Sequence, residues 1–274
     1  SERFYKTNRF GFLPSAQVAW TVSNEKFWKP DFVLSKLKLR ATYGLVGNDQ
    51  IGRAQDRFFY LSDVNMSDPN RSGVFGEERG YSRSGITVNR YDNRDITWET
   101  SKKLNLGLEL GLMKDRLEIL ADYFTEHRYN ILMTRASIPA TMGLSAASKA
   151  NVGEANSHGV DVSIDGNHHF SSAFWMSARG NFTYATSQFK VYKEPVYPND
   201  YSSRVGKPLS QQWGFIAERL FIDEAEVANS PRQLFGSRAG MAGDIKYKDV
   251  NGDGNITELD RMPIGYPTTP EIIY

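Results

Sequence analysis

Apolar and polar residues alternate with a period of two along much of this chain, and this alternation constrains the fold more than any other feature. In residues 104–112 every even position is leucine, while the odd positions hold Asn105, Gly107, Glu109 and Gly111. Successive side chains of a β-strand point to opposite faces, so such a strand has one apolar and one polar face. The aromatic content of 13% agrees with an all-β chain.

Segments with this alternation follow one another in pairs. The predicted antiparallel hairpins join 10–22 with 35–46, 100–113 with 116–129, and 158–166 with 173–187. Each pair is connected by a short link, as antiparallel neighbours allow. Residues 270–274 have the pattern of the start of another strand, so we expect about six full strands and one partial strand.

The links between the segments are unequal in length. Short links at about 23–35, 113–116 and 166–172 alternate with long, polar links at about 47–98, 131–157 and 188–268. The long links therefore all leave one end of the sheet, whereas a soluble sandwich has loops at both ends without such inequality. Short periplasmic turns and long extracellular loops are typical of outer-membrane barrels. The sequence predicts an all-β fold, an antiparallel transmembrane β-barrel portion that forms an incomplete barrel.

The placement of charges and aromatic residues fits two membrane interfaces. We expect the lipid side to carry Leu104, Leu106, Leu108 and Leu110, and the lumen side to carry Asn105 and Glu109, because a charged side chain facing lipid at the midplane costs up to about 2–4 kcal/mol. Two aromatic belts are expected. At the short links they comprise Phe27, Trp28, Phe170, Phe174 and Trp175, and at the long links Tyr43, Trp98, Tyr129, Tyr184 and Phe189.

The bulk composition excludes several classes of protein. The chain has no cysteine, which removes thiol catalysis, cysteine-ligated zinc and disulfides. A net charge of +1 gives no sign of a nucleic-acid partner. The four histidines show no metal spacing, and the sequence has no nucleophile-elbow, P-loop or dinucleotide motif. We therefore expect that the protein is not an enzyme.

Residues 249–260 have the ligand spacing of a calcium loop. The predicted Ca²⁺ ligands are Asp249, Asn251, Asp253, the backbone carbonyl of Asn255, and Asp260. An EF-hand also needs a helix after its loop, and the prolines from Pro263 onward leave no room for one. The alternative is an Asx-rich turn that is satisfied by its own backbone.

Four motifs in order resemble the SusC/RagA family of TonB-linked outer-membrane receptors. The longest is GDIKYKDVNGDGNIT at 243–257, followed by Asp260-Arg261 and IGYP at 264–267. The others are YGLVGN at 43–48, WETSKKLNLG at 98–107, and NVGEANSHGVD at 151–161, where Asp161 stands in place of the usual Glu. The resemblance extends over essentially the whole chain.

This resemblance implies that residues 1–274 are part of a TonB-dependent receptor β-barrel domain in the cell outer membrane. In the family such a barrel imports oligosaccharides or peptides with a SusD-like surface lipoprotein, and energy comes through the TonB complex. Family members also carry a TonB box and a plug domain, neither of which can be matched here, so we expect the chain to be a fragment of the C-terminal barrel region.

The long loops would then meet the substrate or the lipoprotein. The candidate contacts are Trp213, Phe215, Phe221 and Tyr247, because aromatic rings stack on sugars and anchor interfaces. The alternative for these four is packing within the loop itself. A different class of protein, a soluble calcium-binding β-sandwich such as a carbohydrate-binding module, would also explain the aromatics and the Asp-rich loop. It would not explain the long loops at one end.

Overall fold

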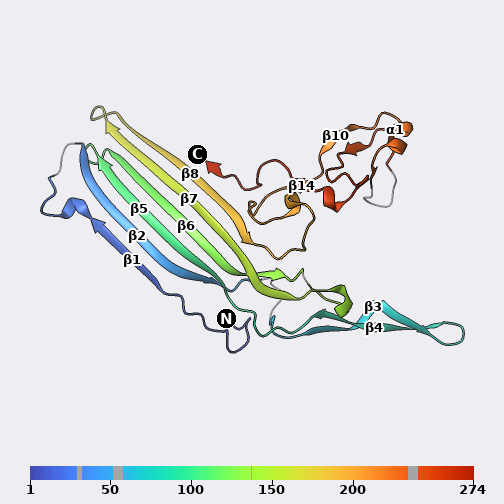
Figure 1. The fold of residues 1–274 in the computed structure, drawn as a ribbon. Helices are drawn as coiled ribbons and strands as arrows, with labels where there is room; N and C mark the ends of the chain where they lie inside the picture. The colour runs from blue at the N-terminus through green and yellow to red at the C-terminus, as the bar shows by residue number, and fades with distance from the viewer. Residues whose placement is uncertain (30–32, 52–57, 137, 234–239) are drawn as a thin grey trace. The chain divides into compact units, whose positions relative to one another are not determined.

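The structure, a computed structural model, describes residues 1–29, 33–51, 58–136, 138–233 and 240–274. It divides into two compact units, one of Ser1–Glu194 with Ile272–Tyr274 and one of Pro195–Glu271. Strands dominate the chain (Figure 1). None of the helices in the described ranges is long and apolar enough to span a membrane.

The first unit is built on one antiparallel sheet of seven strands, in the order β1, β2, β5, β6, β7, β8, β15 (Figure 1). The strands are β1 (Ser15–Thr21), β2 (Leu34–Asn48), β5 (Glu99–Leu112), β6 (Leu117–Thr134), β7 (Lys149–His169), β8 (Trp175–Val191) and β15 (Ile272–Ile273). This confirms the expected six strands and a partial seventh, which pairs with β8. It also confirms the three predicted hairpins, since β1 pairs with β2, β5 with β6, and β7 with β8.

The first strand begins later than the alternation predicted. Phe10 and Phe12 lie before the ladder of β1 with β2, which begins at Ser15, and they are 92% and 89% exposed. Pairing with β2 starts at Pro14, whose carbonyl accepts a hydrogen bond from the Leu45 N–H at 2.9 Å. Proline has no N–H to donate to the ladder, so it suits the beginning of a strand.

The link predicted at 131–157 is much shorter in the structure. Strand β6 continues to Thr134 and β7 starts at Lys149, and their pairing reaches the ladder partners Thr134 and Lys149. The pairing of β6 with β7 shifts register on either side of Ile131, and the preceding Asn130 has a φ of +58°. These irregularities interrupt the alternation of the sequence, although the strand continues beyond them. The turn predicted at 166–172 lies instead between His169 and Trp175.

The link at 47–98 contains a second, two-stranded sheet that the sequence did not predict. It is a hairpin of β3 (Asp63–Phe75) and β4 (Tyr81–Arg90). Its pairing shifts register three times, including a shift between Asp68 and Gly73, and such bulges remove the regular alternation that marks a strand.

The register of the large sheet separates its two faces. One cross-strand row is Leu39, Leu108, Ala121, Val162 and Phe182. The adjacent row, which points to the opposite face, is Arg40, Gly107, Asp122, Asp161 and Thr183. We call the side of the first row the apolar face and the side of the second the polar face. The predicted placement of Leu106 and Leu108 opposite Glu109 follows this register.

Large side chains on the apolar face are open to the surroundings. Trp20, Leu39, Leu106 and Phe182 are 47%, 42%, 46% and 43% exposed. In a soluble β-sandwich this face would be packed against a second sheet about 10 Å away and would be buried. The sandwich alternative is therefore wrong, and the exposed apolar face fits contact with lipid.

The aromatic belts are present in part. At the short-link end Trp20 meets Phe27 with ring centroids 6.5 Å apart, and Phe170 meets Phe174 at 5.3 Å. At the long-link end the register places Tyr43, Tyr129 and Tyr184 on the apolar face.

Two members of the predicted belt at the long links lie elsewhere. Trp98 packs on a small buried core of Phe4, Ile51, Phe59 and Ile96, and its indole N–H donates to the Asn8 carbonyl. Phe189 lies opposite Ala155 on the polar face. The belt prediction is wrong for these two residues. Trp98 precedes β5, and Phe189 lies five positions after Tyr184 on β8, so alternation places it on the opposite face.

The second unit consists of short elements. They are η3 (Asp200–Ser202), β9 (Trp213–Gly214), β10 (Ala217–Leu220), α1 (Glu224–Asn229), β11 (Arg232–Gln233), β12 (Ile245–Tyr247), β13 (Asn255–Ile256), η4 (Glu258–Asp260) and β14 (Met262–Pro263). They form three two-stranded sheets, β10 with β12, β11 with β13, and β14 with β9. The first unit also contains the short helices η1 (Val22–Asn24) and η2 (Ala140–Met142).

Candidate functional site

The polar face of the large sheet carries a connected set of ion pairs. Glu109 on β5 forms ion pairs with three basic residues of β2. The nitrogen–oxygen distances are 3.6 Å to Lys36, 3.1 Å to Lys38 and 3.0 Å to Arg40. Arg40 also reaches across to Asp122 on β6 at 3.0 Å. Positions two apart on one strand share a face, which is why the alternation places these five groups together.

Further ion pairs continue along the same face. Glu126 lies 3.8 Å from Lys103 and 3.4 Å from Arg128, and Arg128 lies 3.5 Å from Glu99. Asp165 on β7 pairs with Arg179 on β8. A face lined with paired charges can border water and exchange hydrogen bonds with a polar solute, which an apolar wall cannot do.

In the second unit, Arg261 contacts two of the four predicted aromatic residues, and a third packs against one of those two. The rings of Phe215 and Tyr247 are 5.5 Å apart at 54°, and the Arg261 guanidinium lies 5.9 Å from the Phe215 ring. Arg261 also donates to the Trp213 carbonyl at 3.0 Å, and Arg204 lies 5.6 Å from the Trp213 ring. All three aromatic residues are half-buried.

Phe221, the fourth predicted residue, is separate from this group. It is only 4% exposed, and its backbone pairs with Asp244 and Gly243 inside the unit. Its ring therefore packs within the unit, as the alternative of loop self-packing describes.

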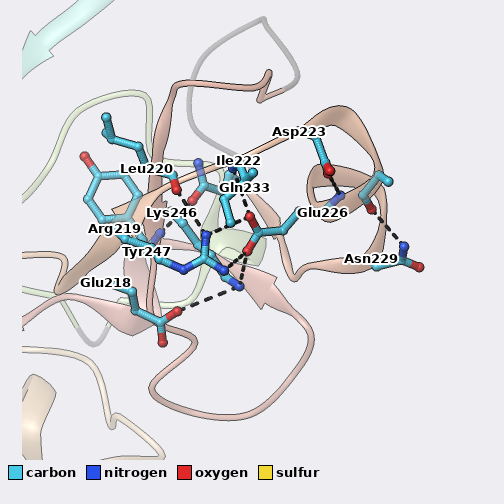
Figure 2. Close-up of polar contacts among 11 residues, drawn as sticks. Glu218, Arg219, Leu220, Ile222, Asp223, Glu226, Asn229, Gln233, Lys246 and Tyr247 are labelled. Atoms are coloured by element: carbon cyan, nitrogen blue, oxygen red, sulfur yellow. Dashed lines mark hydrogen bonds and ion pairs between the residues drawn. The ribbon is translucent and has the colours of Figure 1, made fainter.

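A polar network that the alternation of the sequence does not reveal stabilises the region around α1 (Figure 2). Glu226 accepts two hydrogen bonds from the Arg219 guanidinium, one from the Ile222 N–H at 3.0 Å, and one from Lys246 at 3.0 Å. Asp223 caps the helix by accepting from the Glu226 N–H at 2.7 Å. The Asp-x-x-Glu spacing is close to a capping box and could have revealed this start of a helix.

The side chain of Gln233 extends the same network (Figure 2). Its amide nitrogen donates to the Ile245 carbonyl at 3.0 Å, and its amide oxygen accepts from the Tyr247 N–H at 2.9 Å. It thereby pairs with β12 as a neighbouring strand would. The network links only residues of the second unit and has the character of a structural support.

The ionisation of Glu226 predicts how this region responds to acid. The Arg219 hydrogen bonds, with help from the Ile222 N–H, lower the pKa of Glu226 from 4.5 to about 2. A carboxylate with a depressed pKa in the folded state stabilises it fully above pH 4.5, and this contribution is lost as the pH falls toward 2. We expect hydrogen-exchange protection of α1 and β12 to fall in this window.

The variant Glu226→Gln should have low protection already at neutral pH and little further change on acidification. Glu218→Gln is the matched control, because Glu218 approaches Lys246 only at 4.0 Å and should leave the wild-type profile intact. Equal profiles for wild type and Glu226→Gln would contradict this assignment.

The Asp-rich segment forms a turn closed by its own hydrogen bonds. Asp249 accepts from the Gly252 N–H at 2.7 Å and from the Gly254 N–H at 2.8 Å. Both glycines have left-handed backbones, with φ of +76° and +79°, which a residue with a side chain rarely adopts. Asp253 accepts from the Asn255 N–H at 2.8 Å.

Asp260 is completely buried and closes the turn from its other end. Its carboxylate accepts from the backbone N–H groups of Val250 at 2.9 Å and Thr257 at 2.8 Å. Asn251 donates to the Asp253 carboxylate at 3.0 Å. Among the residues that the structure describes, no three His, Cys, Asp or Glu side chains gather in a way that could hold a metal ion.

Comparison with known proteins gives a consistent picture. The family model described as TonB dependent receptor-like, beta-barrel matches residues 1–258. TonB-dependent receptor P3 of Formosa agariphila is 28% identical over 280 residues, covering 98% of this chain and 26% of that protein. TonB-dependent receptor SusC of Bacteroides thetaiotaomicron is 30% identical over 262 residues, covering 95% of this chain and 25% of that protein.

Solved structures share the fold. The structure of the RagAB peptide transporter matches with a TM-score of 0.66 at 20% identity, over 99% of this chain and 27% of that chain. The chain thus spans about a quarter of the length of the relatives it matches. The family match covers nearly the whole sequence, and the sheet has the exposed apolar face and ion-paired polar face of a barrel wall. The chain therefore belongs to the TonB-dependent receptor β-barrel family, as an outer-membrane barrel segment of the SusC/RagA type.

Proposed function

We propose that this chain forms part of a transporter that imports oligosaccharides or peptides across the outer membrane with a SusD-like lipoprotein. In this role the large sheet is one section of the barrel wall, with the polar face toward the lumen. The energy for import comes through TonB. The half-buried aromatic rings of Trp213, Phe215 and Tyr247 contribute contacts to the substrate or to the lipoprotein.

The observation that carries the proposal is the ion-paired polar face. A wall that only seals a membrane gains nothing from charges on its inner side, whereas a transport path needs a surface that polar solutes can follow. The relatives support the same reading, since one is SusC and a structural neighbour is a peptide transporter. The family membership also argues against a role as an enzyme.

The test uses the full-length receptor in its own cells. A strain without the receptor gene should lose uptake of fluorescently labelled oligosaccharide or peptide, and the same loss should follow when a protonophore removes the energy for TonB. An affinity-tagged receptor should co-purify with a SusD-like lipoprotein from outer membranes. Unchanged uptake in the deletion strain would contradict the proposal.

Calcium binding by residues 249–260 is a separate proposal. The donor set of Asp249, Asn251 and Asp253 suits Ca²⁺, and binding calls for the Asn251–Asp253 hydrogen bond to open so that these oxygens turn toward one point. Calorimetric titration of calcium into the full-length receptor should give a dissociation constant of about 10⁻⁴–10⁻³ M, the range of extracellular calcium-binding modules.

The variant Asp253→Ala should remove the calcium heat. Glu258→Ala is the control, because Glu258 is largely exposed and lies outside the predicted ligand set. Equal or absent heats in the wild type and Asp253→Ala would remove the metal and leave only the turn.

A further inference from the structure

A small cavity lies in the first unit, at the end of the large sheet from which the long links leave. It has a volume of about 90 Å³, and its lining includes Phe59, the end of β4 at Arg90, and the start of β7 at Lys149. This is about the volume of three water molecules, so the cavity has room for a small polar group and not for a whole sugar or peptide. Two of its lining residues, Asn89 and Lys149, are exposed, so the cavity opens to the surroundings.

The walls of this cavity are held by contacts between two links that are far apart in the sequence. The Asn93 side chain donates to the Lys149 carbonyl at 2.9 Å, and the Tyr91 hydroxyl accepts from the Ser145 N–H at 3.1 Å. Phe59 is 1% exposed and belongs to the small buried core of the unit. The fold itself therefore forms the cavity, and a preformed site reduces the ordering that binding would otherwise cost.

Two cations border the cavity. The Arg90 guanidinium lies 5.6 Å from the centre of the Phe59 ring, and the Lys149 ammonium lies 5.9 Å from the same centre. The Arg90 Nε also donates to the Leu61 carbonyl at 3.1 Å, which fixes the direction of the guanidinium. Two like charges beside one small cavity make its potential positive, and an anion between them would offset their repulsion.

The cavity wall itself supplies no carboxylate. No aspartate or glutamate is among the described residues that line it. Asp63, the ladder partner of Arg90, lies outside the lining and accepts from the Asn89 side chain at 3.3 Å. Within the described ranges Lys149 takes part in no ion pair. The lining also includes the Ser148 hydroxyl, so the cavity combines cations with a neutral donor, which is the chemistry that binds an oxyanion.

We propose that this cavity binds the carboxylate group of an acidic solute outside the cell. A carboxylate fits the volume, Lys149 would donate a charge-assisted hydrogen bond to its oxygens, and Arg90 would add its charge. The rest of the solute would extend outward past Asn89 and Lys149. An acidic sugar and the C-terminus of a short peptide both offer this group. The inference rests on the placement of the long links outside the membrane and does not depend on import.

The test is calorimetric titration of the full-length receptor in detergent. The probes form two pairs whose members differ in the carboxylate, glucuronate with glucose and triglycine with triglycinamide. The carboxylate member of at least one pair should bind, and its partner without the carboxylate should not. The pair that responds distinguishes an acidic sugar from a peptide C-terminus as the source of the group.

Variants of Lys149 test the site itself. Lys149→Met should lower the affinity for the carboxylate probe about tenfold, the equivalent of one hydrogen bond to a charged group. Lys149→Arg should retain binding, because it keeps the charge. Lys102→Met is the matched control and should bind as the wild type does, since Lys102 is also an exposed lysine beside a ring, 5.4 Å from that of Tyr129, but does not line the cavity. Gel mobility before and after heating shows that each variant is folded.

Three results would overturn the proposal. The first is that neither carboxylate probe binds, or that each binds no better than its partner. The second is an equal loss of affinity in Lys149→Met and Lys102→Met. The third is that inorganic sulfate binds as tightly as the carboxylate probes and with the same dependence on Lys149, which would indicate a site for free anions.

Discussion

Replacing Leu108 with arginine should destabilise the barrel by about 2–4 kcal/mol, the cost of an arginine that faces lipid near the membrane midplane. Leu108 lies in the middle of the apolar face, opposite Leu39 on one side and Ala121 on the other. The arginine would lie too deep for its charge to reach water easily, and it would also remove a leucine from contact with lipid. Urea-induced unfolding of the full-length receptor in lipid vesicles, followed by tryptophan fluorescence, measures the loss.

The matched control is Leu120→Arg. Leu120 is also a leucine at mid-height, but its register partners are Glu109 and Ser163, so it lies on the polar face. An arginine there meets water and a nearby carboxylate, and the free energy of unfolding should change by about 1 kcal/mol at most. Similar losses for the two variants would contradict the assignment of the faces.

The second large effect is expected at Gly159. A Cβ on this residue of β7 would collide with the Tyr184 carbonyl oxygen and the Phe124 ring, and it would lie 3.0 Å from the Ala185 Cα. Two of these three obstacles belong to the backbone of β8, which cannot move without breaking its ladder with β7. We expect Gly159→Ala to lower the free energy of unfolding by about 1–3 kcal/mol, as overpacking does.

Gly180→Ala provides the comparison. Gly180 lies on the neighbouring strand β8, and a Cβ there would have no heavy atom within 4 Å. The substitution reduces the freedom of the unfolded chain and should stabilise the protein by about 0.4–1 kcal/mol. The same urea titration serves for both variants, and an equal response would show that close packing at Gly159 does not limit stability.

The large sheet could be predicted from the sequence because its signals are local. Alternation with a period of two shows which residues share a face, and the short link after Leu112 fixes the pairing of β5 with β6. The charges on Glu109 and Arg40 then indicate which face is polar. The three hairpins and the two faces follow from these signals alone.

The missed parts depend on interactions that the linear pattern does not contain. The β3–β4 hairpin is irregular, with a bulge where Pro69 interrupts the alternation, so its sequence has the polar character of a loop. The ends of β6 and β7 extend past a register shift at Ile131. In both places the ladder of backbone hydrogen bonds continues although the side-chain pattern stops.

The candidate site shows the same division. The sequence identified aromatic residues in the last long loop, but residue type cannot distinguish the half-buried Phe215 from the buried Phe221. The Asp-rich motif is equally compatible with a cation and with a closed turn, because Asp249 and Asp260 can accept backbone N–H groups in place of a metal. The contacts of Glu226 with Lys246 connect residues 20 positions apart, and only the folded chain brings them together.

The apolar face of the sheet meets lipid and the polar face meets water. Residues 1–274 contain no cysteine, so single cysteines introduced here can report each face once any cysteine elsewhere in the receptor is replaced by serine. A water-soluble maleimide added to the receptor in intact outer membranes should label Asn105→Cys and Glu109→Cys and leave Leu106→Cys and Leu108→Cys unlabelled until the protein is unfolded. Labelling of the two leucine positions with protection of the other two would contradict the barrel assignment.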